Sequence, residues 1–492
     1  MMRIPIDKTL DIPLYSQITT FLRQQIESGA LVEGARLPPS RELASSLGVS
    51  RMTIVNAYAE LEAEGLVLSV HGSGTFVAPP IHVEKVGNTA VSDWPLWQKQ
   101  VVETAVVPLT EKYENLTTKL APPNLISFAS GMGTTEIFDA NGFRKNLQAI
   151  LRRDGANALG YGDSKHGGYE PLRQTIAAIL SSQGIPTLAK DVLITSGSQQ
   201  AIQVAATLLL RPGDVVLVEE STYEGAMDQF TLLDARIVGI SMDEAGMRMD
   251  KLEEALRTTH PKLIYTIPTF HNPTSISMST QRRRQFVELA QHYNVPILED
   301  DFAGDLRYEG HAQPALKALD NNGTVIYVNT FSKALIPGLR IGYLVANGPV
   351  YEQLLIHKRT GDRASSDMMQ RALEAYISVG RYQSHLRKVA RIYRTRRDAM
   401  FSALQQCMPQ EVSWIRPYGG LFLWLKLPEE LTGEALLPTA VKEGVTYVPA
   451  SSFYADHQPR STLRLNFTIH PPHRIHEGIK RLSKAIKKEI GS

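Results

Sequence analysis

Apolar residues at helical spacing mark the start of the chain. Over residues 13–29 they recur every three or four positions, which predicts a helix that ends near Gly29. The same spacing predicts a second helix within residues 37–48 and a third within 50–65. Residues 66–78 then predict two short strands joined as a hairpin. Three helices followed by a hairpin are typical of a winged helix-turn-helix.

Small polar residues and glycines punctuate this amino-terminal pattern. Ser40 and Ser50 precede apolar helical runs, so we expect them to be N-caps of the second and third helices. Gly48 lies between those helices and allows a tight turn. Gly72 and Gly74 would form the tip of the hairpin, the expected wing.

Regular periodicity fades between residues 79 and 120. Prolines stand near both ends of this segment, which reads as a linker, although residues 96–106 could form a short helix. The expected organisation is a winged helix-turn-helix domain over residues 1–78, a linker over 79–120 and a larger domain over 121–492.

The larger domain alternates continuous apolar runs with helical patterns. Uninterrupted Val, Ile and Leu are typical of strands buried on both faces, so the pattern predicts an α/β fold with a mostly parallel sheet covered by helices. The expected strands are residues 191–197, 214–220, 235–241, 262–268, 295–301, 324–330 and 340–347. Active sites in such sheets lie beyond the carboxyl ends of the strands.

Composition narrows the class of protein. A chain of 492 residues is expected to hold two or three domains, and 43% hydrophobic with 21% charged residues is typical of globular proteins. The net charge of +2 gives no general case for nucleic-acid binding, so such a case must be local. The single cysteine excludes a disulfide within the chain and a Cys-rich zinc cluster, so no metal is expected. No signal peptide or membrane-spanning run is evident, and the sequence predicts a cytoplasmic protein without membrane contact.

Polar residues stand just past several of the expected strand ends. In the turn Ser196–Gln199, the amides of Gly197, Ser198 and Gln199 could hold a phosphate at a helix start. The other candidates are Tyr223, Asn272, Asp300, Thr330, Ser332 and Lys333. Each alone is ordinary, because such residues usually cap a helix, begin a turn or face solvent. Together they fit pyridoxal phosphate, which needs a lysine, a phosphate-binding turn, a carboxylate for its ring nitrogen and a ring to stack on.

With these residues in this order, residues 121–492 resemble the fold-type I aminotransferases. The resemblance implies that Lys333 forms a Schiff base with pyridoxal 5'-phosphate and that Asp300 pairs with the pyridinium nitrogen, both as catalytic residues. The other cofactor contacts that it implies are Asn272 to the phenolic oxygen, Tyr223 on the ring, and Ser198, Gln199, Thr330 and Arg340 at the phosphate, with Gly197 and Ser332 beside them.

Two further residues take roles from the same resemblance. Tyr161, in "YGDSKHGGYEPLR", matches a tyrosine that reaches the phosphate of the partner subunit in a head-to-tail homodimer. Arg464, in "STLRLNFT", matches the arginine that binds a substrate carboxylate, and the alternative is a salt bridge at the rim. One residue departs from the pattern: Phe302 stands where a tyrosine commonly bonds the phenolic oxygen, which puts turnover in doubt.

The amino-terminal domain resembles the GntR-type winged helix in "LPPSRELA", "SRMTIVNAYAELEAEG" and "GSGTFV". Residues 1–78 hold six Lys or Arg and eight Asp or Glu, so bulk charge argues against nonspecific DNA binding. The acidic residues, however, gather at the far end of the third helix, away from the helix starts that meet base edges. The expected DNA contacts are Ser40, Arg41, Ser50, Arg51, Thr53, Asn56, His71 and Gly72. The alternative is a winged helix used only for protein contacts.

Both resemblances, in this order along one chain, identify it as similar to the MocR/GabR family. That family implies a transcriptional regulator that binds double-stranded operator DNA and senses a small amine, an amino acid or pyridoxal phosphate itself through an aminotransferase-like domain. The alternative is a working pyridoxal-phosphate aminotransferase that carries a DNA-binding module. Arg464 suggests an amino-acid effector, and nothing in the sequence specifies its side chain or the target genes.

Overall fold

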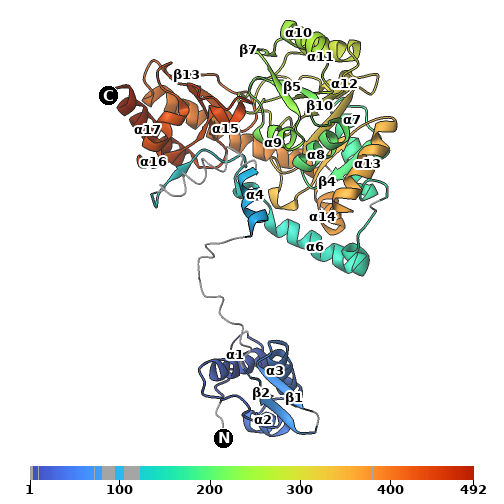
Figure 1. The fold of residues 1–492 in the computed structure, drawn as a ribbon, viewed down its shortest axis with the longest axis vertical. Helices are drawn as coiled ribbons and strands as arrows, with labels where there is room; N and C mark the ends of the chain where they lie inside the picture. The colour runs from blue at the N-terminus through green and yellow to red at the C-terminus, as the bar shows by residue number, and fades with distance from the viewer. Residues whose placement is uncertain are drawn as a thin grey trace. The chain divides into compact units, whose positions relative to one another are not determined.

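The computed structural model describes residues 4–8, 10, 12–70, 72–79, 95–104, 122–163, 165–378 and 380–491. The chain divides into two compact units, Met1–Ala105 and Val106–Ser492 (Figure 1). Most of the predicted linker lies outside the described residues, and α4 (Leu96–Thr104) is a helix within it. No helix in the described part of the chain is long and apolar enough to span a bilayer.

Three helices and a hairpin build the amino-terminal unit (Figure 1). The elements are α1 (Leu14–Glu27), α2 (Ser40–Leu47), α3 (Arg51–Ala63), β1 (Val67–Val70) and β2 (Gly74–Val77). Strands β1 and β2 are antiparallel, with Val70 opposite Gly74. Ile18, Leu22 and Leu61 are fully buried between the helices, so the predicted apolar stripes form the core of the unit.

The structure confirms one predicted cap and corrects the other. Ser50 is the N-cap of α3, and its side chain accepts a hydrogen bond of 3.1 Å from the backbone amide of Thr53. Ser40, however, is the first helical residue of α2, because Pro39 holds the extended conformation at the N-cap position. Gly48 ends α2 in the left-handed conformation with φ of 59°, as the predicted turn requires.

A seven-stranded sheet forms the centre of the larger unit, in the order β4-β12-β11-β10-β9-β5-β6. Its strands are β4 (Val192–Thr195), β5 (Val215–Glu219), β6 (Arg236–Ile240), β9 (Leu263–Thr266), β10 (Ile297–Asp300), β11 (Val325–Thr330) and β12 (Gly342–Val345). All neighbouring pairs are parallel except those of β12, which is antiparallel to both of its neighbours. The mostly parallel sheet predicted from the apolar runs is confirmed.

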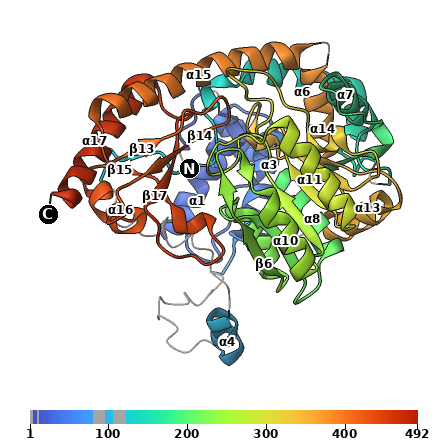
Figure 2. The same cartoon turned by 90° about the horizontal axis from the view of Figure 1, so that it is seen from above.

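Helices cover both faces of this sheet (Figure 2). On one face, α8 (Ser198–Leu209), α9 (Glu224–Leu232) and α13 (Pro349–Asp362) bury apolar residues against the strands. On the other, α7 (Glu170–Ser182), α10 (Met249–Thr259) and α11 (Thr280–His292) do the same. Further elements of the unit are α6 (Ala140–Asp154), α12 (Leu316–Leu319), α14 (Asp367–Ile377), β7 (Met242–Asp243) and β8 (Gly246–Met247). Successive residues of the inner strands are therefore buried on opposite faces, which is why most of their positions are apolar.

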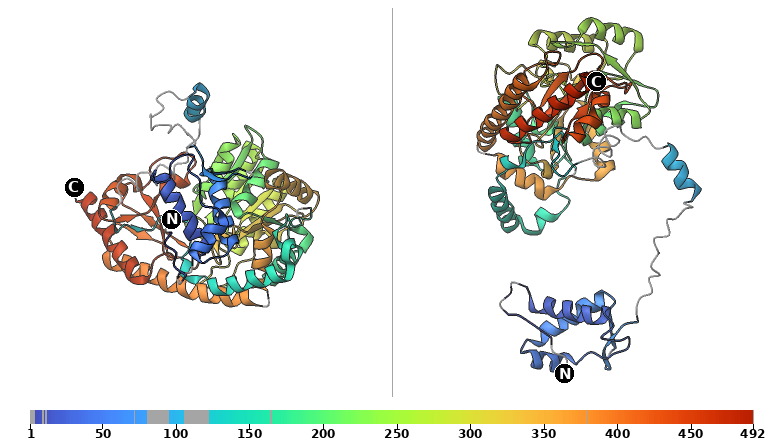
Figure 3. Two further views of the ribbon diagram at one scale, coloured as in Figure 1. Left: turned by 90° about the horizontal axis from the view of Figure 1, so that it is seen from below. Right: turned by 90° about the vertical axis from the view of Figure 1, so that its left-hand side faces the viewer.

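A carboxyl-terminal lobe lies beside the large sheet (Figure 3). Its antiparallel sheet has the order β13-β14-β17-β16, and helices α15, α16 and α17 share its core. The bounds are α15 (Arg381–Cys407), β13 (Ser413–Trp414), β14 (Phe422–Lys426), α16 (Gly433–Lys442), β16 (Val448–Pro449), β17 (Thr462–Asn466) and α17 (Pro472–Ile490). A short strand that precedes the large sheet in sequence, β3 (Ile126–Ser127), pairs with β15 (Val445–Thr446) of this lobe. The chain therefore enters the unit through the lobe that also ends it.

Candidate functional site

The polar candidates gather beyond the carboxyl ends of the central strands. Asp300 is the last residue of β10, and Lys333 lies three residues beyond the end of β11, which runs parallel to β10. Tyr223 follows β5 and Asn272 follows β9 in the same way. Because parallel strands end at one edge of the sheet, residues spread over more than 100 positions of sequence meet in one place. Together with Ser198 and Arg464 they line a cavity of about 120 Å³, whose other walls are Gly131, Glu224, Phe302 and Phe422.

Lys333 places its amine at this cavity. Its Nζ donates a hydrogen bond of 2.9 Å to the backbone carbonyl of Gly131, which belongs to the segment that follows β3. Burial lowers the pKa of Lys333 to about 8, while the carboxylate of Glu224 acts in the opposite direction. On the order of a tenth of the amine is therefore neutral near pH 7, far more than for an ordinary lysine, and the neutral form is the one that attacks a carbonyl carbon.

Asp300 offers one free carboxylate oxygen to the same cavity. The hydroxyl of Tyr265 donates a hydrogen bond of 2.8 Å to its Oδ2, whereas its Oδ1 is buried without a hydrogen-bond partner. Burial raises the pKa of Asp300 to about 6, and the hydrogen bond from Tyr265 limits that rise. An unpartnered buried acceptor needs a donor, and the protonated ring nitrogen of pyridoxal phosphate is a donor of the required kind. The residues at this end of the cavity therefore fit that cofactor.

Arg464, on β17, closes the cavity from the carboxyl-terminal lobe. Its side chain is only 2% exposed, and it donates hydrogen bonds of 2.8 Å to Oδ1 of Asn272 and 3.1 Å to the carbonyl of Ala129. The guanidinium lies between two aromatic rings, 4.2 Å from the centroid of Phe422 and 4.7 Å from that of Phe453. Such stacking fixes a planar guanidinium in one orientation. Arg464 is thus buried rather than exposed at the rim, and its Nη1 lies 3.9 Å from Oε2 of Glu224.

Phe302 lies where the resemblance expects a hydroxyl. Its ring stacks on Phe422 with centroids 6.3 Å apart and an angle of 27° between the planes. Phe302 therefore supports a ring that in turn contacts the Arg464 guanidinium. It has no donor for an oxygen in the cavity.

A close backbone approach shapes the expected phosphate-binding turn. Gly197 precedes α8 with φ of +96°, and a Cβ at this position would lie 2.8 Å from Nη2 of Arg340. The positive φ favours glycine here, and its lack of a side chain leaves room for the Arg340 guanidinium, which donates a hydrogen bond of 3.2 Å to the carbonyl of Ser196. Ser198 begins α8, so its amide belongs to the unpaired donors of a helix start.

The other predicted phosphate contacts have partners within the protein. The hydroxyls of Thr330 and Ser332 are buried and lie 3.0 Å apart. The Gln199 side chain accepts a hydrogen bond of 3.0 Å from the hydroxyl of Tyr223 and donates one of 2.5 Å to the carbonyl of Gly225. Gln199 thus holds the ring predicted to stack on the cofactor. Tyr161 lies outside this cavity, with 82% of its surface exposed in the single chain.

Sequence reasoning missed Glu224, Tyr265, Phe422 and Phe453 as residues of the site. Glu224 is adjacent to Tyr223, but nothing in its local pattern indicates that it faces Arg464, 240 positions later. Tyr265 lies inside β9, where its position between apolar residues predicts only a core residue. A signal was available for Tyr265 alone, because a buried tyrosine hydroxyl needs a partner.

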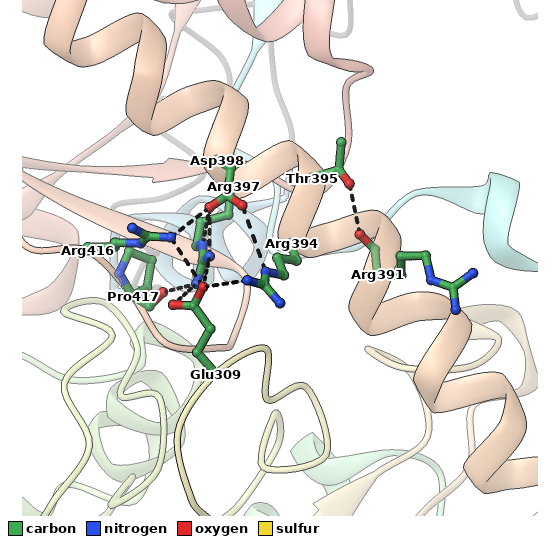
Figure 4. A network of polar contacts seen from close by, with 8 residues as sticks. All are labelled: Glu309, Arg391, Arg394, Thr395, Arg397, Asp398, Arg416 and Pro417. Carbon is green, nitrogen blue, oxygen red and sulfur yellow. Dashed lines mark hydrogen bonds and ion pairs between the residues drawn. The ribbon is translucent and has the colours of Figure 1, made fainter.

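A cluster of charged residues ties the carboxyl-terminal lobe to the loop after β10 (Figure 4). Glu309 accepts hydrogen bonds of 2.9 and 3.2 Å from Arg397 of α15, and it pairs with Arg394 and Arg416 at 3.2 Å each. Arg397 also donates to the carbonyl of Pro417 at 2.9 Å. This cluster anchors the segment that leads into β14, whose first residue, Phe422, contacts Arg464.

The amino-terminal unit presents its predicted DNA contacts at the helix starts. Arg41, Arg51 and Asn56 are exposed, and Nε of Arg51 lies 3.4 Å from the hydroxyl of Ser40, which brings the starts of α2 and α3 together. Ser50 and Thr53 are joined by a 2.8 Å hydrogen bond between their hydroxyls. Gly72 is exposed at the hairpin tip, and His71 lies outside the described residues.

A basic residue beside the wing, Arg36, was not among the predicted DNA contacts. Arg36 precedes α2, and its Nε would lie 2.8 Å from a Cβ at Gly74 of the hairpin. A pocket lined by Arg36, Ser40 and Gly74 joins the start of α2 to the wing. The Arg36 guanidinium therefore lies between two of the elements predicted to approach DNA.

Two family models match the chain. The model for "Aminotransferase class I and II" covers residues 131–482, and the model for "Bacterial regulatory proteins, gntR family" covers residues 14–77. Over nearly the whole chain, the sequence is 30% identical to the uncharacterized HTH-type transcriptional regulator YdfD of Bacillus subtilis, with 99% of each chain covered. It is 29% identical to the probable rhizopine catabolism regulatory protein MocR of Rhizobium meliloti, covering 98% of this chain and 95% of that protein.

Other similar proteins match about four fifths of the chain. The chain is 37% identical over 400 residues to aromatic-amino-acid aminotransferase 1 of Thermococcus litoralis, which covers 80% of this chain and 95% of that enzyme. Among solved structures, LysN of Thermus thermophilus is an alpha-aminoadipate aminotransferase complexed with N-(5'-phosphopyridoxyl)-L-leucine. It has a TM-score of 0.72 and 31% identity, covering 78% of this chain and 100% of that chain.

Proposed function

Since this chain belongs to the class I and II aminotransferases and, over its full length, to the MocR/GabR family of regulators, we propose that it is a transcriptional regulator whose larger unit senses a small amine or amino acid through pyridoxal 5'-phosphate. The observation that carries the proposal is the union, in one chain, of a gntR-type unit with exposed basic helix starts and a cavity that joins Lys333, Asp300 and Arg464. An enzyme with no regulatory role would need only the cavity and not the DNA-binding unit.

Pyridoxal 5'-phosphate is the cofactor of this family, and when bound it supplies an aldehyde for amines and a ring that withdraws electrons. Lys333 supplies the amine for the aldehyde, and burial, which lowers its pKa to about 8, raises the fraction that is neutral. Asp300 would accept a hydrogen bond from the protonated ring nitrogen at its free Oδ1. Tyr223, whose hydroxyl donates to Gln199, would stack on the ring, and Asn272 would bind the phenolic oxygen. Gly197, Ser198, Thr330, Ser332 and Arg340 form the phosphate-binding region.

Arg464 binds the carboxylate of the effector. Its guanidinium is buried, stacked between Phe422 and Phe453, and its Nε has no hydrogen-bond partner. A carboxylate bound there gains charge-assisted hydrogen bonds in a site that excludes water. An effector whose amine replaces that of Lys333 would therefore be held at two points, one on the large-sheet side and one on the carboxyl-terminal lobe.

Effector binding alters DNA binding by favouring one arrangement of the lobe and the large sheet over another, since a ligand shifts an equilibrium only by its differential affinity. We propose domains at 1–78 and 121–492 joined by the linker 79–120, and a head-to-tail homodimer in which Tyr161 reaches the partner's phosphate site. The exposure of Tyr161 supports that role. The two winged helix-turn-helix domains of the dimer then bind two half-sites on double-stranded operator DNA in the cytoplasm.

A catalytic aminotransferase is the second candidate, because proteins similar to this chain include enzymes of that class. Phe302 weighs against efficient turnover, since it brings no hydroxyl to the cavity. One measurement distinguishes the regulator from the catalytic aminotransferase. Amino-group transfer to a keto acid at an ordinary enzyme rate, about 10 per second, favours the enzyme.

The deciding experiment follows the visible spectrum and the operator affinity of the holo-protein together while amines and amino acids are scanned. We expect the effector to change both at the same concentration. A ligand that changes the spectrum but leaves operator affinity constant would contradict sensing, and an operator response to cofactor alone would make pyridoxal phosphate itself the signal.

A further inference from the structure

Glu224 faces the same cavity as Lys333 and Arg464 and has no role in the function proposed above. It is the first residue of α9, and its side chain is 21% exposed. Its Oε2 is buried, lies 3.9 Å from Nη1 of Arg464 and has no hydrogen-bond partner. This distance exceeds that of a hydrogen bond, so the two groups attract each other without satisfying each other.

Arg464 has a buried hydrogen-bond donor without a partner, which complements the unpartnered acceptor of Glu224. Two of its nitrogens bond to Asn272 and Ala129, but its Nε is buried without a partner. A buried acceptor on Glu224 and a buried donor on Arg464 thus occur together at one cavity. Buried polar groups in folded proteins have partners as a rule, and exceptions call for an explanation. A ligand that supplies both a donor and an acceptor would complete the pair.

The other charged groups of the cavity have uses already. Asp300 takes the pyridinium nitrogen and Lys333 takes the aldehyde in the proposed function. Among the described residues that line the cavity, Arg464 and Glu224 are the charges left for an effector, one positive and one negative. They lie 3.9 Å apart at one cavity, so a ligand that carries both an ammonium and a carboxylate could contact both residues.

We propose that Glu224 is a specificity-determining residue that makes the site select a diamino monocarboxylic acid. One amine of such a ligand reacts at the cofactor, its carboxylate binds Arg464, and its second amine, as an ammonium, binds Glu224. An acidic amino acid is disfavoured because its second carboxylate would lie near that of Glu224. A neutral amino acid leaves Glu224 without a partner. This inference rests on the proposed function, since it assumes that the cavity holds pyridoxal phosphate and an amine.

The test uses the holo-protein and three amino acids of similar length: L-ornithine, L-norvaline and L-glutamate. Each is titrated while the visible absorption of the cofactor is followed, in the wild type, in Glu224→Gln and in the control Glu253→Gln, at equal cofactor loading. Glu253 is an exposed carboxylate on α10, away from the cavity. Because a charge-assisted hydrogen bond is lost, we expect Glu224→Gln to lower the affinity for L-ornithine by about tenfold or more. The affinity for L-glutamate should rise. Glu253→Gln should match the wild type.

The outcomes separate the two proposals. Equal changes for all three ligands in Glu224→Gln would mean that Glu224 is only a counter-ion of Arg464, and would overturn the inference alone. A wild-type preference for L-glutamate or L-norvaline over L-ornithine would overturn it as well. If none of the three alters the spectrum although the cofactor is bound, amine sensing at this site fails together with the inference.

Discussion

The hydroxyl of Tyr265 donates a hydrogen bond of 2.8 Å to Oδ2 of Asp300, and this bond leaves Oδ1 as the free acceptor. It also keeps the pKa of Asp300 from rising further than about 6, because a hydrogen bond to a carboxylate favours its charged form. Tyr265 on β9 therefore sets both the direction and the charge of the group predicted to pair with the cofactor's ring nitrogen.

Replacing Tyr265 by Phe removes this bond. We expect the dissociation constant of pyridoxal phosphate at neutral pH to rise about tenfold, since a hydrogen bond to a charged group contributes roughly 1.5–3 kcal/mol. Fluorescence titration of apo-protein measures it. Tyr293→Phe, at the end of α11, is the matched control. Equal affinity in both variants would show that Asp300 does not need Tyr265.

Replacing Lys333 by Ala tests the covalent link. The variant should fold, because Lys333 makes one hydrogen bond, to the carbonyl of Gly131. It should lack the visible absorption that pyridoxal phosphate gains on bonding to a lysine, and borohydride should attach no cofactor to it. Lys262→Ala, an exposed lysine at the start of β9, serves as the control. A variant spectrum like that of the wild type would point to another lysine.

Capture of pyridoxal phosphate by the apo-protein should depend on pH in two ways. The rate should rise with pH until about 8 and then level off, because the neutral Lys333 amine is the nucleophile and burial lowers its pKa to about 8. Affinity should fall below about pH 6, where Asp300 becomes protonated. Stopped-flow absorbance from about pH 5 to about pH 10 measures both. A rate that still climbs near pH 10 would indicate an ordinary, exposed lysine.

Replacing Phe302 by Tyr restores the hydroxyl that the resemblance expects. A donor to the phenolic oxygen stabilises its charged form by roughly 1.5–3 kcal/mol. The pKa of the visible band should therefore fall by about one unit or more, at about 1.4 kcal/mol per unit. A spectroscopic pH titration measures the shift, with Phe401→Tyr in the carboxyl-terminal lobe as the control. If the two variants titrate alike, position 302 does not reach the phenolic oxygen.

Replacing Arg41 by Ala tests the DNA-binding face. We expect weaker operator binding and a salt dependence lowered by about one in the slope of log K against log salt, because one phosphate contact is lost. Arg23→Ala removes the same charge from a residue that pairs with Glu64 at 2.5 Å, so it should leave the slope unchanged. Equal slopes for Arg41→Ala and wild type would place Arg41 off the DNA.

Local patterns in the sequence were sufficient for the order of elements and for part of the site. The apolar runs predicted the seven strands of the large sheet, and the rule that parallel strands end at one edge placed Asp300 beside Lys333. Ser50 was recognised as a cap because its bond to Thr53 spans three residues. The misplaced cap at Ser40 shows the limit of that approach, since the conformation of Pro39 decided where α2 begins.

Contacts across long sequence separations were decided only by the tertiary structure. Whether Arg464 lies at the rim or inside the cavity depends on how Phe422 and Phe453, from separate parts of the lobe, pack around it. The same packing brings Glu224 to 3.9 Å from Arg464 and leaves both with unsatisfied groups. Helix and strand periodicity records which face of an element is buried, but not which distant side chain that face will meet. The residues for the cofactor could therefore be predicted from the sequence, whereas the charge selectivity proposed for the ligand site depends on contacts that only the fold creates.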